Sequence, residues 1–116
     1  PGYRAMTDLL QRLFGDEAAS ALRAPYCLGD RQELSALFHD AGIASARIET
    51  RPGQAVFPSI EAWVHTDIKG WTLAEMIDER QFDTLLREAE TALQSFVSTD
   101  GTVRFDHPAH IVTATR

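Results

Sequence analysis

Two histidines near the end of the chain are the residues whose types and spacing first suggest chemistry. His107 and His110 form an H-x-x-H pair, which can contribute ligands to a metal ion. Residues three apart on a strand point to opposite faces, however, and no set of cysteines or carboxylates completes a four-ligand site. We therefore expect no metal centre here. His39 and His65 lie in predicted helices far away in the sequence, and we expect both to be surface or hydrogen-bonded side chains.

Cys27 and Pro1 are the candidate nucleophile and the candidate base. A cysteine nucleophile needs a nearby base and an orienting group, and the residues around Cys27 supply neither, so we expect a buried, inert thiol. Pro1 could act as an N-terminal amine base, as in tautomerases, because an apolar site lowers the pKa of a secondary amine. The proline of that family leads straight into a strand, whereas Gly2 and Tyr3 lead into a predicted helix, which disfavours this interpretation.

Large apolar side chains make up the candidate binding set. Trp63 and Trp71 flank a predicted helix, and Tyr3, Phe57 and Val64 are further large candidates. These residues could wall a substrate pocket, or they could pack as the core of a helical cap, which is the commoner fate of such side chains. If the chain is a piece of a longer protein, these side chains could instead be exposed and drive self-association. We predict all five as substrate-binding residues, with core packing as the alternative.

Length and composition fit one small domain. The chain has 116 residues, of which 44% are hydrophobic and 24% charged, and such a chain can form a core without disulfides or metal. The net charge of −6 argues against nucleic acid or an anionic membrane as the main partner. The single cysteine suits a reducing cytoplasm, and the sequence contains neither a membrane-spanning apolar run nor a secretory signal.

The stretch 29–49 organises the predicted fold. Asp30 is a good helix N-cap with Glu33 three residues later, and Gly42 follows the helix as its stop signal. Apolar and polar residues then alternate over 44–50, which predicts a half-buried strand. Helix and strand together form one αβ unit, and such a unit needs a sheet to join.

The rest of the chain is predicted to be mostly helical. Further helices are expected over 3–14, 17–22, 59–68, from 72 and over 79–97, and short extended segments over 54–57, 102–105 and 109–115. We expect one α+β domain over 1–116, in which strand 44–50 pairs antiparallel with strand 109–115 and packs on several helices. Its parts are a helical lead-in (1–29), a helix and strand (30–50), a helical cap (52–100) and a terminal strand (102–115).

The pieces of this chain, taken in order, resemble the C-terminal half of class I S-adenosylmethionine-dependent methyltransferases of the small-molecule type. The pieces are PGYRAMTDLLQRLFGDEAASALRAPYCLGD, the helix and strand to Glu49, VFPSIEAWV, the long helix, and DGTVRFDHPAHIVTATR. The run L-G-D, an amphipathic helix and then A-G before an apolar residue are common across that family. The runs F-P-S-x-E-A-(aromatic)-V and A-H-I-V-T-A are characteristic of one branch.

The resemblance implies a place for each element in a larger, Rossmann-like sheet of seven strands. Segment 30–42 corresponds to the last helix, 43–50 to strand six and 109–115 to the reversed strand seven. Segment 52–100 corresponds to a helical insertion that roofs the substrate cleft. The implied activity is methyl transfer from S-adenosylmethionine to a small-molecule acceptor.

One feature of the family has no counterpart in this sequence. The family binds its cofactor with a glycine-rich turn and an acidic residue, by a logic like that of the dinucleotide fingerprint, whereas all seven glycines here are isolated. We therefore expect a cytoplasmic C-terminal fragment that supplies the lid of the acceptor pocket and neither binds the cofactor nor catalyses alone. Because the exposed edge of its strand pair needs cover, we also expect a homodimer.

The alternative function is a non-enzymatic module that binds a small ligand or another protein. An apolar cleft under the segment 57–71, without catalytic groups, would suit such a module.

Overall fold

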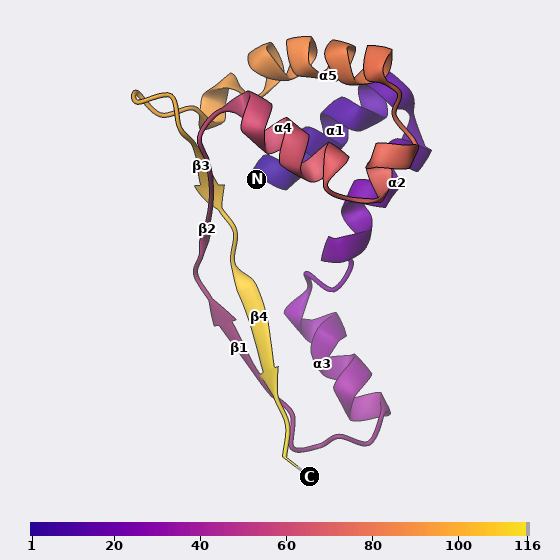
Figure 1. The fold of residues 1–116 in the computed structure, drawn as a ribbon. Helices are drawn as coiled ribbons and strands as arrows, with labels where there is room; N and C mark the ends of the chain where they lie inside the picture. The colour runs from indigo at the N-terminus through magenta and orange to yellow at the C-terminus, as the bar shows by residue number, and fades with distance from the viewer. Residues whose placement is uncertain (116) are drawn as a thin grey trace.

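Residues 1–115 are described by the computed structural model, and they form an α+β fold (Figure 1). The five α-helices of these residues are α1 (Gly2–Phe14), α2 (Asp16–Arg23), α3 (Arg31–Asp40), α4 (Ile60–Lys69) and α5 (Glu79–Ala92). They are joined by three 3-10 helices: η1 (Ala24–Tyr26), η2 (Thr72–Glu75) and η3 (Gln94–Phe96). The strands are β1 (Arg47–Arg51), β2 (Gln54–Phe57), β3 (Val103–Asp106) and β4 (Ala109–Thr113).

Four of the helices form a lobe around the hydrophobic core. α1 packs against α2 and α5, and α4 packs against α5 (Figure 1). The apolar stripes predicted from helical spacing face inward, so that Met6, Leu10, Trp63 and Leu85 are fully buried. Within the described chain, residues 23–54 and 106–115 contribute nothing to this core.

The two long helices of the second half begin at side-chain caps. The Ser59 hydroxyl accepts a hydrogen bond from the Ala62 N–H, and Asp78 forms a reciprocal capping box with Gln81. The predicted end of the last helix was wrong, because α5 stops at Ala92 and the chain tightens into η3. Phe96 and Val97 still pack against the core, which explains why the apolar pattern continued past the helix.

The predicted start and stop signals of α3 are confirmed. The Asp30 carboxylate accepts hydrogen bonds from the backbone N–H groups of Gln32 (2.7 Å) and Glu33 (3.1 Å). Gly42 has a φ of +75° just beyond the helix, a conformation in which a side chain would be strained.

The predicted strand pair is present with shorter strands, and it is half of a longer ribbon. β1 pairs antiparallel with β4, and β2 pairs antiparallel with β3. The two ladders share one register, which runs from Arg51↔Ala109 to Gln54↔Asp106 and therefore sets Pro52 opposite Pro108. Proline has no N–H to donate, so this proline pair interrupts the ladder. The β2–β3 pairing was not predicted.

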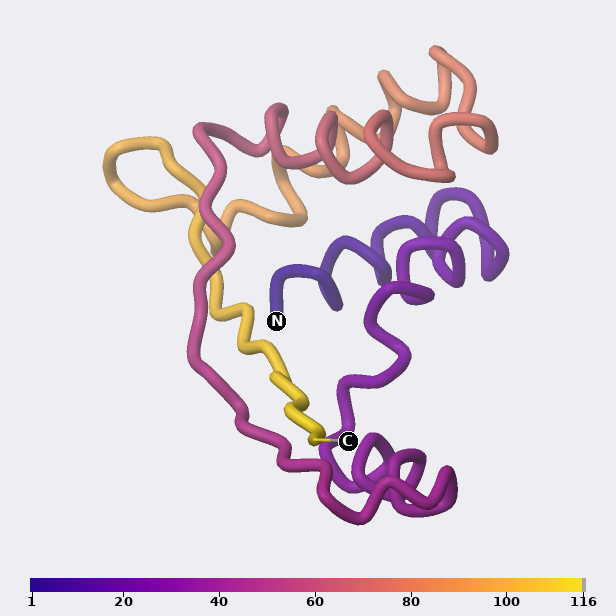
Figure 2. Tube along the Cα trace, turned by 60° about the horizontal axis from the view of Figure 1, so that its bottom comes forward, coloured from indigo at the N-terminus to yellow at the C-terminus, as the bar shows by residue number. Residues whose placement is uncertain are grey.

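The lobe covers one face of the ribbon in its upper half (β2 and β3), and α3 covers the other face in its lower half (β1 and β4). In the upper half, Val103 and Phe105 point into the helical lobe and are buried. In the lower half, Val112 faces α3, while Ile111 on the other face is 43% exposed. Because alternate residues of a strand point to opposite faces, Ile111 lies on the face that carries Phe105. The lobe and α3 nevertheless lie on the same side of the ribbon in Figures 1 and 2, because the twist of the ribbon turns its other face toward α3 in the lower half.

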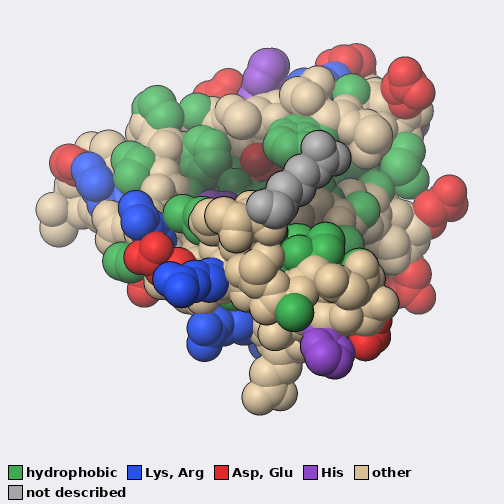
Figure 3. Space-filling view, turned by 90° about the horizontal axis from the view of Figure 1, so that it is seen from below, with side chains coloured by type: hydrophobic (Ala, Val, Ile, Leu, Met, Phe, Trp, Pro, Cys, Tyr) green, Lys and Arg blue, Asp and Glu red, His purple; other side chains and the backbone are tan. Residues whose placement is uncertain are grey.

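The lower half of the ribbon and α3 project from the lobe as an arm, which we define as residues 28–51 and 109–115 (Figures 1 and 2). The radius of gyration is 16.7 Å, whereas a compact domain of this length has about 13 Å. Seen from the end of the arm, apolar side chains are exposed around a hollow (Figure 3). Leu28, Leu37, Ile43 and Ile111 are arm residues with 38% to 53% of their surface exposed.

Candidate functional site

Three of the five predicted substrate-binding residues meet in one aromatic cluster. Phe57 stacks on Trp63 with ring centroids 5.8 Å apart, and Tyr3 lies edge-on to Trp63 at 6.4 Å. Phe105 contacts both, at 5.2 Å from Tyr3 and 4.7 Å from Trp63. Elements α1, β2, α4 and β3 thus converge at this cluster, which lies where the ribbon enters the lobe.

The other two predicted residues lie apart from each other. Val64 is fully buried in the core beside Trp63, whereas Trp71 is 53% exposed in the turn after α4. A substrate role for all five residues stays a prediction. Trp63 and Val64 have no exposed surface, so a ligand could touch them only if the cluster opened.

A buried carboxylate lies behind the aromatic cluster. Trp63 Nε1–H donates a hydrogen bond to Asp67 Oδ2 at 2.6 Å, and Asp67 is only 4% exposed. Burial raises the pKa of the Asp67 carboxyl to about 6, although the Trp63 hydrogen bond acts in the opposite direction. Sequence reasoning missed this aspartate, because a helical i, i+4 pair of Trp and Asp is as compatible with a surface as with a core.

Tyr3 also forms the outer edge of the cluster, where it meets two residues that sequence reasoning did not assign to a binding site. Its ring lies 4.7 Å from that of Tyr26 and 4.9 Å from that of His107. Tyr26 comes from η1 and His107 from the link between β3 and β4, so only the folded chain brings them together. Burial raises the pKa of both tyrosines, and both hydroxyls therefore stay protonated at neutral pH.

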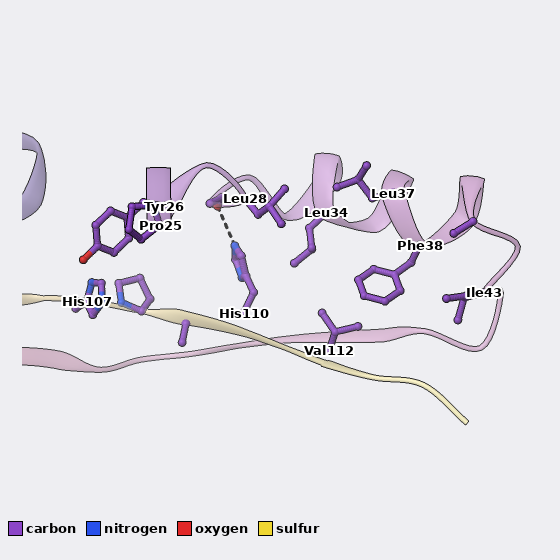
Figure 4. Close-up of a pocket in the computed structure, with 14 residues that line it drawn as sticks. Pro25, Tyr26, Leu28, Leu34, Leu37, Phe38, Ile43, His107, His110 and Val112 are labelled. Atoms are coloured by element: carbon purple, nitrogen blue, oxygen red, sulfur yellow. Dashed lines mark hydrogen bonds between the residues drawn. The ribbon is translucent and has the colours of Figure 1, made fainter. Parts of the chain in front are cut away.

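A large cleft lies between α3 and β4, below this aromatic edge (Figure 4). Its volume is about 860 Å³, which is within the range of small-molecule pockets. Its walls are mainly apolar side chains: Leu28, Leu34, Leu37, Phe38, Ile43 and Val112. In Figure 4, Leu34 and Phe38 point from α3 toward Val112 of β4. We expected an apolar cleft under 57–71, but the cleft lies here, because Phe57, Trp63 and Val64 pack into the lobe.

His110 ties the two walls of the cleft together. Its Nε2 lies 2.9 Å from the Gly29 carbonyl oxygen, and its Nδ1 lies 2.8 Å from Thr50 Oγ1 (Figure 4 shows the first contact). In the neutral ring, Nε2–H donates to Gly29 and Nδ1 accepts from the Thr50 hydroxyl. Both ring nitrogens are thereby engaged, and His110 holds the start of α3 against the ribbon.

The chemistry of the cleft is that of binding. None of the residues that line it is acidic, lysine, arginine, serine, threonine or cysteine. Such a surface can bury an apolar ligand or an apolar protein face, and its polar side chains are those of Tyr26, His107 and His110.

The expectation of a buried Cys27 was wrong. Cys27 is exposed after η1, because the segment that carries it runs over the surface between the lobe and the arm.

His107 and His110 have separate partners, as described above. Among residues 1–115, no three His, Cys, Asp or Glu side chains are grouped so that they could hold a metal ion.

Comparison of this chain with protein-family models, with curated proteins and with solved structures finds no match. In the described part of the chain, no helix combines the length and the apolar character that crossing a bilayer requires. A function must therefore be argued from the fold and its pockets.

Proposed function

We propose that this chain is the acceptor-cap portion of a cytoplasmic S-adenosylmethionine-dependent methyltransferase that acts on a small molecule. The observation that carries the proposal is the order and direction of the arm. A helix (α3) leads into a strand (β1), residues 52–108 intervene, and a strand of opposite direction (β4) returns beside β1. This is the order that the family has for its last helix, strand six and reversed strand seven.

The surface of the arm supports the same proposal. A lone two-stranded ribbon is marginal in water, and both outer edges of the β1–β4 pair carry unpaired backbone groups. The cleft between α3 and β4 leaves further apolar surface uncovered next to one of these edges. In the proposed enzyme, the remaining strands would pair with this ribbon and fill that face.

The residues of this chain do not fit the cofactor itself. S-adenosylmethionine would need a turn whose backbone approaches it closely, as glycine-rich turns allow. Among residues 1–115, the glycines with positive φ are Gly15, Gly42 and Gly101, and they belong to three separate turns. In the proposed enzyme, this chain would hold and position the acceptor, while the sulfonium of the cofactor would supply the driving force for transfer.

Calorimetry and the neighbouring coding sequence test this proposal. Titration of the chain with S-adenosylmethionine should give no binding heat at micromolar concentrations. The coding sequence upstream of Pro1 should contain a glycine-rich βαβ stretch, and a protein that joins that stretch to this chain should bind the cofactor. Micromolar binding by the 116-residue chain alone, or a stop codon or promoter directly upstream, would contradict the proposal.

The cleft between α3 and β4 favours a second candidate function, that of a non-enzymatic module for a small ligand or a protein partner. Its volume and its uncharged walls are those of a binding site. The same upstream sequence separates the two candidates, because a promoter or stop codon there favours the module.

A further inference from the structure

A second pocket lies between α1 and the chain that runs from the end of α2 through η1. It has a volume of about 500 Å³, enough for a small organic molecule. Leu22 is a buried part of its wall, and the two tyrosines of the aromatic edge, Tyr3 and Tyr26, also line it. In Figure 4, the Tyr26 hydroxyl points away from α3. The linings of the two cavities have Tyr26 in common and no other residue, so the cavities are distinct sites.

The charged side chains of this pocket are both positive. Arg4 and Arg23 line it, and no acidic residue does, although the whole chain carries a net charge of −6. Within residues 1–115, neither arginine has a carboxylate oxygen within 4.0 Å, whereas Arg12, Arg51 and Lys69 each form a salt bridge. The positive charge at this pocket is thus uncompensated by the protein itself.

A neutral amide holds one of these arginines in place. An N–H of the Arg23 guanidinium donates to Gln11 Oε1 at 2.9 Å, and Gln11 Nε2 in turn donates to Asp16 Oδ1 at 2.5 Å. Gln11 therefore bridges the Asp16 carboxylate and the Arg23 guanidinium. An arginine positioned in this way keeps its other N–H groups free for an anion, and it loses less conformational entropy when the anion binds.

The rest of the pocket suits an apolar, flat body. Leu22 and the rings of Tyr3 and Tyr26 supply apolar contacts, and aromatic rings favour stacking or edge contacts with another ring. The protonated hydroxyls of the tyrosines carry no charge that would repel an anion. One face of the site is thus apolar and the rim is cationic.

We propose that this pocket binds a small organic anion with a flat apolar body, an aromatic carboxylate being the simplest case, with its charged group between Arg4 and Arg23. Insofar as the chain is the acceptor cap of a methyltransferase, which is the proposed function, this anion is the class of the methyl acceptor. The binding site itself requires neither the cofactor nor the rest of the enzyme.

Nuclear magnetic resonance titration of the isotope-labelled chain tests the site. The probes are 2-naphthoate and the neutral 2-naphthamide, which have the same ring system and differ in charge. Naphthoate should shift the backbone amides of residues 3–7 and 20–27, and it should bind at least tenfold more tightly than naphthamide. Equal binding of the two probes, or shifts centred on α3 and β4, would overturn the proposal.

Substitutions test whether the two arginines cause the tighter binding of naphthoate. Arg4→Gln and Arg23→Gln should each weaken naphthoate binding about tenfold, which corresponds to about 1.4 kcal/mol, and leave naphthamide binding unchanged. Both side chains are exposed, so the thermal unfolding midpoint should stay within about one degree of the wild type. Arg80→Gln, an exposed arginine on α5, is the matched control and should bind naphthoate as the wild type does. Wild-type affinity in either pocket variant would refute the assignment.

The outcome is independent of the methyltransferase proposal. Naphthoate binding that depends on Arg4 and Arg23 supports the pocket whatever lies upstream in the gene. If no glycine-rich βαβ stretch is found there, the pocket stands and its ligand loses the role of methyl acceptor.

Discussion

At the scale of single residues, Asp67 is the clearest case of a group that folding perturbs. Its carboxyl is buried behind the aromatic cluster, with the Trp63 indole N–H as its hydrogen-bond partner. The folded-state pKa is about 6, against an ordinary value of 3.8 for an aspartate carboxyl. Between these two values the folded chain binds more protons than the unfolded chain, so the stability contributed by Asp67 is greatest at low pH and falls as pH rises through this window.

Asp67→Asn should remove this pH dependence. The amide oxygen can still accept from Trp63, and the buried charge is gone, so we expect the free energy of unfolding at pH 8 to rise by about 1–3 kcal/mol. The gain should disappear near pH 3, below both pKa values, where the wild-type carboxyl is mostly protonated in both states. Urea denaturation of both proteins between pH 3 and pH 8 measures the difference.

Asp83→Asn is the matched control for this substitution, since Asp83 is exposed on α5. It should change stability by less than about 0.5 kcal/mol at every pH. A pH-independent effect of Asp67→Asn, or a loss of stability at pH 8, would show that the buried charge is not the cause.

At the scale of elements, the junction of the ribbon depends on one glycine. The Gly53 carbonyl accepts a hydrogen bond from the His107 N–H at 2.8 Å, directly beside the opposed prolines. A Cβ at position 53 would stand 2.7 Å from the His107 carbonyl oxygen, and both groups belong to backbone that cannot move alone. The close approach of the two strands therefore requires glycine at this position.

Gly53→Ala should loosen the arm while leaving the lobe folded, because the arm shares no core with the lobe. Amide hydrogen exchange in β1 and β4 should become about tenfold faster, equivalent to about 1.4 kcal/mol, and exchange in α1 and α5 should not change. Gln54→Ala, at the exposed neighbouring position, is the control and should leave exchange in the arm as it is. Uniform acceleration in both parts would contradict the separation of arm and lobe.

Local signals in the sequence predicted most helices and strands of this fold. The pairing of distant strands and the aromatic edge depend on contacts between residues far apart in the sequence, which local signals do not reveal. The cap at Asp30 and the left-handed Gly42 act within a few residues, and they fix α3 as the sequence indicates. The β2–β3 pairing joins segments almost fifty residues apart, and a strand of four residues before Pro58 carries too short a pattern to reveal it. The aromatic edge of Tyr3, Tyr26 and His107 was missed for the same reason.

The binding residues could be predicted by type but not by exposure. The sequence identified Trp63 and Trp71 as large apolar side chains, and both interpretations of such residues, core or pocket, were open. The tertiary structure buries the first completely and leaves the second half exposed. Cys27 was misjudged in the same way, because an irregular link contains no periodicity from which burial can be inferred.

At the scale of the whole molecule, the chain exposes more surface than a compact monomer would. Its accessible surface is 7749 Å², whereas a monomer of 12.9 kDa exposes about 6300 Å². The excess, roughly 1400 Å², is larger than the approximately 800 Å² that each partner buries in an interface of standard size. Much of the exposed apolar surface lies on the arm, where Leu28, Leu37, Ile43 and Ile111 are found. The chain as a whole therefore has surface to spare for an interface, and the arm carries exposed apolar side chains suited to one.

The free chain should form a homodimer through the arm, because a second copy can cover the cleft between α3 and β4 and the unpaired strand edges that the proposed enzyme would cover with its own sheet. Light scattering after size-exclusion chromatography at about 100 µM should give twice the monomer mass. Leu37→Glu places a charge on the open cleft wall, where the side chain is 53% exposed, and should shift the mass to that of the monomer without unfolding the lobe. Met76→Glu, at a position on the lobe that is 39% exposed, should leave the dimer intact. A monomeric wild type at this concentration, or a Leu37→Glu dimer, would show that the arm is not the surface through which copies of this chain associate.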